Sequence, residues 1–289
     1  MTKVVILGLY NPNKQTLDLC LSSLIKQSDY VIIVDNSDKS SSEYFNNDKI
    51  FYFHTCNIGI AAAQNIGIEK AFSLSFDYIL FSDQDTIYPE NYFETGIAVI
   101  KKLNDPNFGG LTPVILDKNK KSFGFVKRFL FFKYKIKYLK KYYLHVSEAI
   151  NSGFIVTNKS INKVGKFEEK LFLDWVDFEW CWRARKHGLN IYGTNSISIT
   201  HDLGHGTGKL FGKEYPLNQK YRYYYIIRNG IYLALYSKNN FFLKLNVLLN
   251  TARYFIGYIV FSGEKLEVFK VLLRALKDGL YKSMGKLKN

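Results

Sequence analysis

The first 110 or so residues alternate between short aliphatic runs and stretches in which apolar residues recur at helical spacing, and this alternation constrains the fold most strongly. The aliphatic runs predict four strands, at 3–9, 30–34, 50–54 and 78–81. The stretches between them predict helices at 13–26 and 58–75, and another helix that ends near Leu103. Strands that alternate with helices in this way are typical of a parallel sheet covered by helices on both faces.

Acidic clusters follow directly after two of the predicted strands. Asp35 begins the sequence Asp-Asn-Ser-Asp after the second strand, and Asp83 begins Asp-Gln-Asp after the fourth. In open α/β sheets, ligands bind beyond the carboxyl ends of the strands. We therefore expect both clusters to lie at the binding edge of the sheet.

The rest of the chain is less regular. Strands are predicted at 109–116 and 148–158, and Ser160 is expected to cap a short helix. A helix is predicted at 176–187, because acids open it, basic residues close it and Gly188 follows. Beyond residue 215 the pattern predicts amphipathic helices, at 216–237, 240–261 and 265–285.

Composition excludes several classes of protein. With 47% hydrophobic residues among its 289, the chain is too apolar for a disordered protein. Three widely spaced cysteines provide neither a disulfide framework nor metal-ligand spacing, which favours a reducing compartment. The apolar run at the N-terminus is too short for a signal peptide and fits a first strand better.

The net charge of +15 is concentrated in two aromatic-rich segments. Residues 118–142 hold ten basic residues and no acid, whereas residues 222–289 hold twelve basic and three acidic residues. Basic residues interleaved with Phe and Tyr suit an anionic membrane surface or single-stranded nucleic acid, and such aromatics can also simply pack inward. No apolar run approaches the about 20 residues that cross a bilayer, so we expect surface association without spanning.

Four motifs carry candidate chemistry. Asp83 and Asp85 can reach one divalent cation, although an Asp-X-Asp sequence is also common in turns. Between Asp174 and Trp180, acids alternate with aromatic residues, so that a carboxylate there can act as a general base beside an aromatic wall. The segment 57–67 is rich in Gly and Ala, which allows either close approach of a phosphate to a helix start or tight helix packing. His201, in a Gly-rich loop, is a candidate third metal ligand or a structural residue.

Six pieces of this sequence occur in an order that resembles a known family. They are Tyr10-Asn11-Pro12, Val34-Asp35-Asn36-Ser37, Asn57–Gly67, Asp83-Gln84-Asp85, Asn151-Ser152-Gly153 and Asp174–Arg185. Together, over roughly residues 3–235, they look like the inverting family 2 glycosyltransferases, most of all the bacterial rhamnosyltransferases of O-antigen and capsule assembly. The resemblance implies the α/β GT-A fold, a Rossmann-like, mixed and mainly parallel sheet flanked by helices, here with a C-terminal amphipathic helical extension.

The resemblance also implies site residues. Asp177 matches the catalytic base. The positions implied for the nucleotide sugar are Leu9, Tyr10, Asn11, Asp35, Asn57, Gly59, Gln64, Asn65 and Asp83. The positions implied for a divalent cation, Mg²⁺ or Mn²⁺, are Asp83, Asp85 and His201. The positions implied for the acceptor and donor pocket are Ser152, Gly153, Trp175, Glu179 and Trp180.

A function and a domain plan follow from the resemblance. We expect a metal-dependent transfer of L-rhamnose from dTDP-rhamnose to a lipid-linked glycan acceptor, at the inner face of the bacterial cell membrane. The glycosyltransferase domain is predicted at 1–215, with a basic-aromatic insert at 118–146, and a membrane-associating helical region at 216–289. One alternative is the same fold with a UDP-hexose or UDP-N-acetylhexosamine donor. A more distant alternative is a nucleic-acid-binding protein, a function that leaves the acidic clusters unexplained.

Overall fold

The computed structural model describes residues 1–116, 122, 124–129, 132–136, 142–200, 207–210, 213–216 and 220–287. The chain forms two compact units. The sheet unit comprises Met1–Lys127, Tyr134–Glu168 and Asp177–Asp202. The helical unit comprises Arg128–Lys133, Glu169–Val176 and Leu203–Asn289. The helical unit thus takes in a short segment from the middle of the chain, directly before Asp177.

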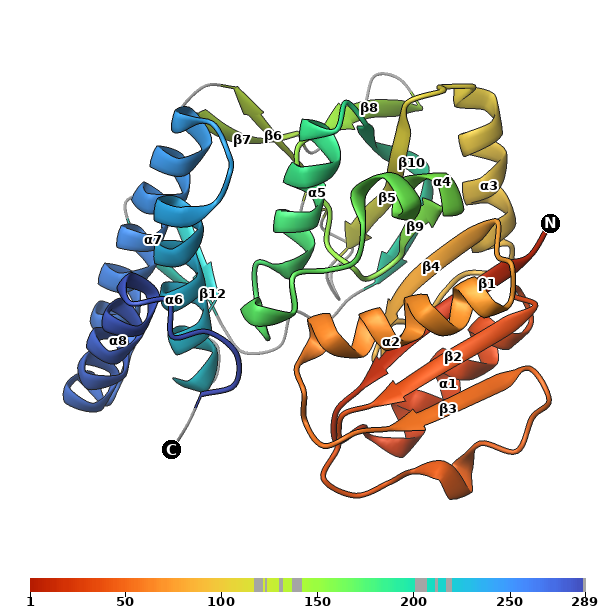
Figure 1. The fold of residues 1–289 in the computed structure, drawn as a ribbon, viewed down its shortest axis with the longest axis horizontal. Helices are drawn as coiled ribbons and strands as arrows, with labels where there is room; N and C mark the ends of the chain where they lie inside the picture. Colours follow the sequence, from red (N-terminus) through yellow and green to blue (C-terminus); the bar gives the residue numbers. More distant parts are fainter. Residues whose placement is uncertain are drawn as a thin grey trace. The chain divides into compact units, whose positions relative to one another are not determined.

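The sheet unit is built on one eight-stranded sheet in the order β3-β2-β1-β4-β9-β5-β10-β8 (Figure 1). Its strands are β1 (Lys3–Leu9), β2 (Tyr30–Asp35), β3 (Ile50–His54), β4 (Tyr78–Asp83), β5 (Phe108–Leu116), β8 (Tyr143–Val146), β9 (Phe154–Thr157) and β10 (Asn190–Thr200). β1 pairs in parallel with both β2 and β4, β2 pairs in parallel with β3, and β5 pairs in parallel with β10. β8 and β9 run antiparallel to their neighbours. The predicted mixed, mainly parallel sheet is confirmed.

Helices cover both faces of this sheet because side chains alternate along each strand. The helices of the sheet unit are α1 (Lys14–Ile25), α2 (Ile60–Ser73), α3 (Tyr92–Leu103), α4 (Asn158–Val164) and α5 (Val176–Lys186). On β1, Val5 and Leu7 belong to the core that α1 and α3 close. Ile6 points the other way and contacts α2 so closely that a Cβ on Gly67 would lie 2.5 Å from its side chain. The predicted helices of the first hundred residues are all present.

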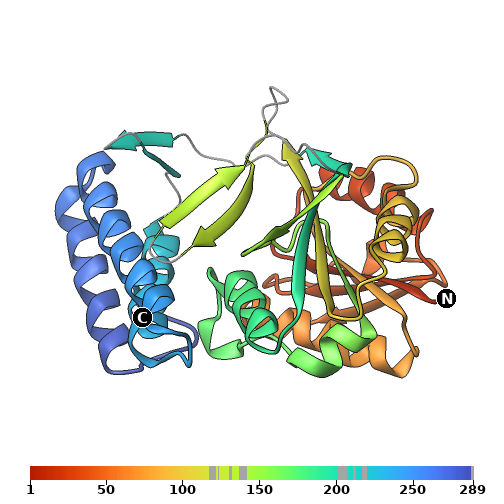
Figure 2. The ribbon, with the colours of Figure 1, turned by 90° about the horizontal axis from the view of Figure 1, so that it is seen from above.

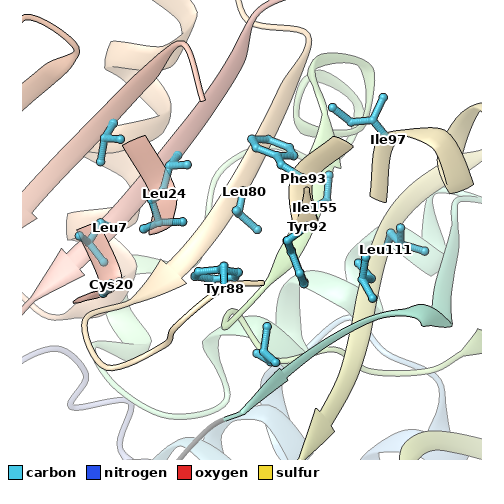
Figure 3. Packing of buried hydrophobic residues seen from close by; sticks show 14 of the residues in the cluster. Leu7, Cys20, Leu24, Leu80, Tyr88, Tyr92, Phe93, Ile97, Leu111 and Ile155 are labelled. Atoms are coloured by element: carbon cyan, nitrogen blue, oxygen red, sulfur yellow. The ribbon is translucent and has the colours of Figure 1, made fainter. Parts of the chain in front are cut away.

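The core between the sheet and helices α1 and α3 consists of interlocking aliphatic and aromatic side chains (Figure 3). Leu7, Leu80 and Ile155 extend from neighbouring strands, and Leu24 and Phe93 meet them from the helices. Cys20 lies in the same layer, where burial raises the pKa of its thiol to about 12. The thiol therefore stays protonated and packs as a small apolar group.

The segment that leads into β9 corrects two expectations. The strand predicted at 148–158 is limited to Phe154–Thr157, because Asn151–Gly153 form a turn in which Gly153 has φ +81°. A Cβ on Gly153 would come within 2.5 Å of the Tyr92 hydroxyl, so this turn requires glycine. Ser160 does not cap α4. Thr157 caps it, and its hydroxyl accepts a hydrogen bond from the Ser160 backbone N–H.

The remaining strands form two small sheets. β6 (Phe125–Phe129) pairs with β7 (Phe132–Ile136) inside the basic-aromatic insert. β11 (Thr207–Leu210) pairs antiparallel with β12 (Lys213–Pro216). None of these strands, nor β8 or β10, was among the sequence-based predictions.

The three predicted C-terminal helices are confirmed as α6 (Lys220–Tyr236), α7 (Phe241–Phe261) and α8 (Lys265–Leu280). They run side by side in the helical unit (Figure 2). Their shared core contains Ile227, Tyr258 and Leu272. Within the described part of the chain, no helix is both long enough and apolar enough to cross a membrane.

Candidate active site

Polar residues from four segments meet at one edge of the sheet. β1, β2 and β4 run parallel and therefore end together, whereas the antiparallel β9 begins at that same edge. The segments brought to this edge are Leu9–Asn11, Asp35–Ser37, Asp83–Asp85 and Asn151–Gly153. The strand order changes direction between β1 and β4, and such a switch point is where open α/β sheets bind ligands.

Gln84 fastens the ends of β1 and β4 together. The Tyr10 backbone N–H donates to Gln84 Oε1 at 2.8 Å, and Gln84 Nε2 donates to the Tyr10 carbonyl at 3.2 Å. The middle residue of Asp-Gln-Asp is thus structural. The Tyr10 side chain remains 45% exposed, so its ring is accessible for stacking on a nucleotide base. Asn11, with φ 45°, turns the chain so that its N–H donates to the Ser37 hydroxyl at 2.7 Å.

Asp35 is fully buried at the end of β2, and both of its carboxylate oxygens accept hydrogen bonds. The Ser37 N–H donates to Oδ1 at 2.9 Å, and the Tyr52 hydroxyl donates to Oδ2 at 2.7 Å. Burial alone raises the pKa of Asp35, but the hydrogen bonds from Ser37, Tyr52 and Ser41 outweigh it and lower that pKa below its ordinary value. The carboxylate therefore holds the turn in shape, and its predicted contact with the nucleotide base stays a prediction.

Asn36 is a residue that the sequence reasoning missed. Its Oδ1 accepts hydrogen bonds from the Thr55 hydroxyl at 2.9 Å and from the Ile58 N–H at 3.3 Å. Its Nδ2 donates to the Gly59 carbonyl at 3.4 Å. Asn36 thereby brings the start of α2, with Asn57 and Gly59, to the end of β2. Its position next to Asp35 in a strand-end cluster was the available signal.

Gln64 and Asn65 are both buried in α2. Asn65 holds Phe167 by its backbone: Nδ2 donates to the Phe167 carbonyl at 3.0 Å, and Oδ1 accepts from the Phe167 N–H at 2.8 Å. These bonds tie α2 to the segment after α4. In the described part of the chain, Gln64 Oε1 has no hydrogen-bond partner. The contacts predicted for both residues with a nucleotide sugar remain predictions.

Asp83 and Asp85 supply two carboxylates at the end of β4. The Ser152 hydroxyl donates to Asp83 Oδ2, which joins the turn before β9 to the end of β4. Asp85 is exposed. Mg²⁺ and Mn²⁺ prefer oxygen ligands, and Mg²⁺ commonly uses one or two carboxylates and leaves positions for phosphates, so this pair fits such an ion. Among the described residues, no group of three His, Cys, Asp or Glu could hold a metal ion. The predicted ligand His201 lies outside the described residues.

Three residues of α5 fasten the loop that follows α4. Glu179 accepts from Arg183 Nε at 2.7 Å, and the guanidinium also donates to the Val164 carbonyl at 2.8 Å and the Lys166 carbonyl at 2.7 Å. Trp180 Nε1 donates to the Gly165 carbonyl at 2.9 Å.

The burial of these residues bears on their predicted role in a pocket. The Trp180 ring is 0% exposed and packs against Phe154 and Phe167, so it is a core residue in this structure. Glu179 is likewise buried. The aromatic and acidic pattern of this helix therefore anchors a loop.

Asp177 differs from these neighbours. It lies in the first turn of α5 and is only half-buried, and its Oδ1 accepts from the Phe178 N–H at 2.9 Å. A carboxylate in the first turn of a helix is favoured by the helix dipole. Of the two acids in α5, Asp177 is thus the one that solvent can reach.

The loop before α5 has an unusual backbone. Phe172, Asp174 and Trp175 have φ of 63°, 60° and 66°, in the left-handed region that residues other than glycine rarely adopt. Each such residue costs about 1–3 kcal/mol and persists only where its surroundings hold it.

Helix α6 supplies these holding contacts within the helical unit. Asn229 Nδ2 donates to the carbonyls of Leu171 at 2.9 Å, Leu173 at 2.7 Å and Asp174 at 3.1 Å. Trp175 Nε1 donates to the Ile226 carbonyl at 3.0 Å. Trp175 is therefore engaged in the loop, and its predicted place in a binding pocket stays a prediction.

Two arginines of α6 complete the arrangement. Arg222 forms an ion pair with Asp174 at 2.5 Å. Arg228 is fully buried, and it donates to the Leu171 carbonyl at 2.9 Å and to the Gly285 carbonyl at 2.5 Å. Arg228 thus connects the loop before α5 to the segment after α8.

Comparisons of sequence agree with this geometry. The model of the family "Glycosyl transferase family 2" matches residues 4–165, which is more than half of the chain. The dTDP-rhamnosyl transferase RfbF of Shigella flexneri is 27% identical over 95% of this chain and 94% of its own. An uncharacterized glycosyltransferase of Rickettsia bellii (strain RML369-C) is 32% identical, over 35% of this chain and 15% of its own.

Comparisons of structure agree on the fold. The crystal structure of GalNAc-T7 with UDP, GalNAc and Mn²⁺ superposes with a TM-score of 0.59 at 15% identity, over 91% of this chain and 58% of that one. S. aureus TarS superposes with a TM-score of 0.58 at 18% identity, over 97% of this chain and 49% of that one. This chain thus spans about half the length of either structure. The family model matches most of the sheet unit, and the strand ends of this GT-A fold bring the expected carboxylates together. This chain is therefore a glycosyltransferase of family 2.

Proposed function

We propose that the chain transfers L-rhamnose from dTDP-rhamnose, with inversion, to a hydroxyl of a lipid-linked glycan in the assembly of O-antigen or capsule polysaccharide. The observation that carries this proposal is the similarity to dTDP-rhamnosyl transferase RfbF over nearly the whole of both chains. The similarity extends beyond the segment that the family model matches and includes the C-terminal helices.

In this proposal Asp177 is the general base. An acceptor hydroxyl is a weak acid and needs a base within reach as it attacks the anomeric carbon. Asp177 accepts that proton, and the new glycosidic bond forms on the face opposite the departing nucleoside diphosphate. One displacement inverts the anomeric centre and needs no covalent enzyme intermediate. The half-buried position of Asp177, beside the buried Glu179 and Trp180, supports its choice as the reacting acid.

A divalent cation would be held by Asp83 and Asp85, with His201 as a further candidate ligand. When bound, such an ion supplies Lewis-acid stabilisation of the charge that develops on the leaving diphosphate. In this proposal the exposed ring of Tyr10 stacks on the nucleotide base, and Asn57 and Gly59, just before α2, contact the nucleotide sugar.

The location of the reaction follows from the acceptor. A lipid-linked glycan places the enzyme on the inner face of the cell membrane, as a peripheral protein with no nucleic-acid partner. The region 216–289 and the basic-aromatic insert would mediate the association. We expect deletion of Lys133–Lys141 to lower recovery with membranes while activity on a soluble acceptor is retained.

The test is turnover with a panel of nucleotide sugars and a series of divalent cations. We expect dTDP-rhamnose to be the preferred donor, by at least about tenfold in kcat/KM over UDP-glucose, UDP-galactose and UDP-N-acetylglucosamine, with activity restored by Mg²⁺ or Mn²⁺ after chelation. If the enzyme prefers a UDP sugar, the proposed donor is wrong and that UDP sugar replaces it, within the same family. If the enzyme neither hydrolyses nor transfers sugar from any of these nucleotide sugars, the proposal is overturned.

A further inference from the structure

Helix α7 has large apolar side chains on its exposed side, and polar residues share its buried side with apolar ones such as Val247. Asn246, Thr251 and Tyr258 face the interior of the helical unit, with exposed fractions of 5%, 1% and 0%. Thr251 donates to the Val247 carbonyl at 2.8 Å, and Asn246 accepts from Asn250 at 2.7 Å, so these two side chains are hydrogen-bonded. An ordinary surface helix keeps its apolar stripe on the core side, whereas α7 also carries large apolar side chains on its exposed side.

The exposed side of α7 carries an apolar stripe in return. Its exposed members, spaced as one helical face requires, are Phe241, Leu248, Leu249, Ile256 and Val260. Arg253 borders this stripe on the side away from α8, as its helical position and exposure indicate. A folded chain gains nothing in water from such a stripe, because leaving large apolar side chains hydrated costs free energy.

Helix α8 continues this surface. Val268, Leu272, Ala275 and Gly279 face the core, and the neighbouring stripe of Leu266, Phe269, Leu273 and Leu280 is exposed, with Leu266 reaching 70%. The Phe269 ring meets Phe255 of α7 edge to face, at 6.4 Å between centroids, so the two apolar stripes adjoin. The far border of the α8 stripe is basic: Lys270, Arg274 and Lys277 are all exposed.

These residues define the α7–α8 face: the apolar stripes of both helices, with Arg253 at one border and Lys270, Arg274 and Lys277 at the other. We propose that this face docks on an anionic lipid bilayer, with its apolar side chains at the depth of the acyl boundary and its basic side chains among the headgroups. Amphipathic helices bind bilayers in this way, through buried apolar area together with attraction to anionic lipids. The proposal rests on the membrane association proposed above and names the face that makes it, but it does not depend on the identity of the donor or acceptor.

Charge favours a bilayer over a second copy of the chain. Between residues 241 and 287 there are eight basic and three acidic residues. The acids have partners within the unit. Glu264 and Glu267 pair with Lys220, whereas Asp278 accepts from the Tyr224 hydroxyl and pairs with Arg274 at 3.8 Å. A twofold contact through the α7–α8 face would bring like-charged borders together, whereas anionic headgroups neutralise them.

The test is cosedimentation of the full chain with vesicles of phosphatidylglycerol and phosphatidylcholine in equal parts, and with vesicles of phosphatidylcholine alone. We expect binding to the anionic vesicles and at least about tenfold weaker binding to the neutral ones. The apolar arm is the double variant Ile256→Asn with Leu273→Asn, which should weaken binding about tenfold or more. The basic arm is Lys270→Gln with Lys277→Gln, which should weaken it by a similar factor and flatten its dependence on salt.

Matched controls make the same chemical changes on the sheet unit. Ile87→Asn with Leu19→Asn replaces an exposed isoleucine and an exposed leucine, and Lys26→Gln with Lys101→Gln removes two exposed charges. These variants should bind as the unchanged chain does, and the thermal midpoint of every variant shows whether it is folded.

Loss of binding in both arms with binding kept in the controls supports the proposal. The proposal is overturned if the unchanged chain does not bind anionic vesicles, or if the apolar and the basic variants bind as well as the controls do. It is also overturned if the chain is a dimer in solution that the apolar arm dissociates and that binds no vesicles, because the face then serves self-association. None of these readouts uses nucleotide sugar, so they are independent of the proposed transfer.

Discussion

Asp177 and Glu179 lie two residues apart on α5, yet the fold gives their carboxylates different tasks. Glu179 is buried against Arg183, which in turn holds the carbonyls of Val164 and Lys166. Asp177 lies in the first helical turn and is half-buried. Two acids on one short helix are thus separated into a structural anchor and a candidate base.

Replacing Asp177 with Asn should abolish the proposed proton transfer while keeping the shape of the side chain. Because general-base catalysis contributes about 10²–10⁴-fold, we expect kcat with dTDP-rhamnose to fall by roughly that factor. Initial rates, with circular dichroism to verify folding, make the measurement. Asp18→Asn, at an exposed site on α1, is the matched control and should keep full activity. An Asp177→Asn enzyme with near-normal turnover would show that the base lies elsewhere.

Asp35 should contribute stability that depends on pH. Its pKa is lowered in the folded chain, so the folded state favours the charged carboxylate. The contribution is therefore complete above the unfolded pKa of about 4 and is lost as the pH falls through the lower, folded value. We expect Asp35→Asn to lower the free energy of unfolding by about 1–3 kcal/mol at pH 7.

The prediction for Asp35 is tested by measuring the stability of both chains at a series of pH values. Urea titrations should show the difference between Asp35→Asn and the unchanged chain shrinking below about pH 4. A difference that grows toward acid pH would mean that the hydrogen bonds of Ser37 and Tyr52 do not stabilise the charged form.

At the scale of elements, α6 determines how α5 begins. The loop 169–176 belongs to the helical unit, and the chain passes from Val176 directly to Asp177. Asn229 holds the loop through three backbone carbonyls, and Arg222 and Trp175 add further contacts. These contacts therefore hold the loop whose last residue, Val176, directly precedes the candidate base.

Replacing Asn229 with Ala should impair catalysis through this loop. Three carbonyls lose the Asn229 amide, although that of Leu171 keeps its bond from Arg228. We expect kcat to fall about 10–100-fold with the KM for the nucleotide sugar changed much less, and stability to fall by about 1–3 kcal/mol. Asn229→Gln, which keeps the amide, should recover part of kcat, and Asn195→Ala, at an exposed position on β10, is the control. Equal losses of stability and kcat in the Gln and Ala variants would leave Asn229 as a packing residue only.

Sequence patterns predicted the helices and strands that are determined by the spacing of their own residues. The strand at 3–9 and the helix at 13–26 follow from the spacing of their own apolar residues, and Asn13 caps α1 as such residues do. Other features are set by distant partners. The turn Asn151–Gly153 reads as strand until Tyr92 and Phe81 are seen to fix it, and Trp180 looks like a pocket residue until Phe154 and Phe167 enclose it.

The whole molecule combines a sheet unit that carries the candidate chemistry with a helical unit that carries much of the basic charge. The candidate site itself was predictable where a cluster ended a predicted strand, as at Asp35 and Asp83. The contacts between segments far apart in the sequence were not predictable, for example the hydrogen bond from Ser152 to Asp83. Such contacts depend on the order of the strands in the sheet, and no local sequence pattern predicts that order.

Removing the cation should weaken donor binding. A ligand that binds only the folded chain raises its stability by about 2.7 kcal/mol at a hundred times its Kd, so saturating dTDP-rhamnose with Mg²⁺ should raise the unfolding temperature by several degrees. We expect EDTA to abolish most of that rise, and Asp85→Asn to do so with Mg²⁺ present. Differential scanning fluorimetry makes the measurement, with Asp18→Asn as control. A rise that survives both changes would mean that donor binding needs no cation at these carboxylates.

The contact between Arg228 and the Gly285 carbonyl has a consequence for synthesis of the chain. The loop at Lys170–Trp175 leaves the ribosome well before Gly285, and at about 5–20 residues per second the delay is on the order of ten seconds. During that interval the sheet can assemble around its own strands, but the left-handed residues before Asp177 lack part of their support. A nascent enzyme would therefore acquire its shape first and its competence for transfer only when its late-made segment arrives.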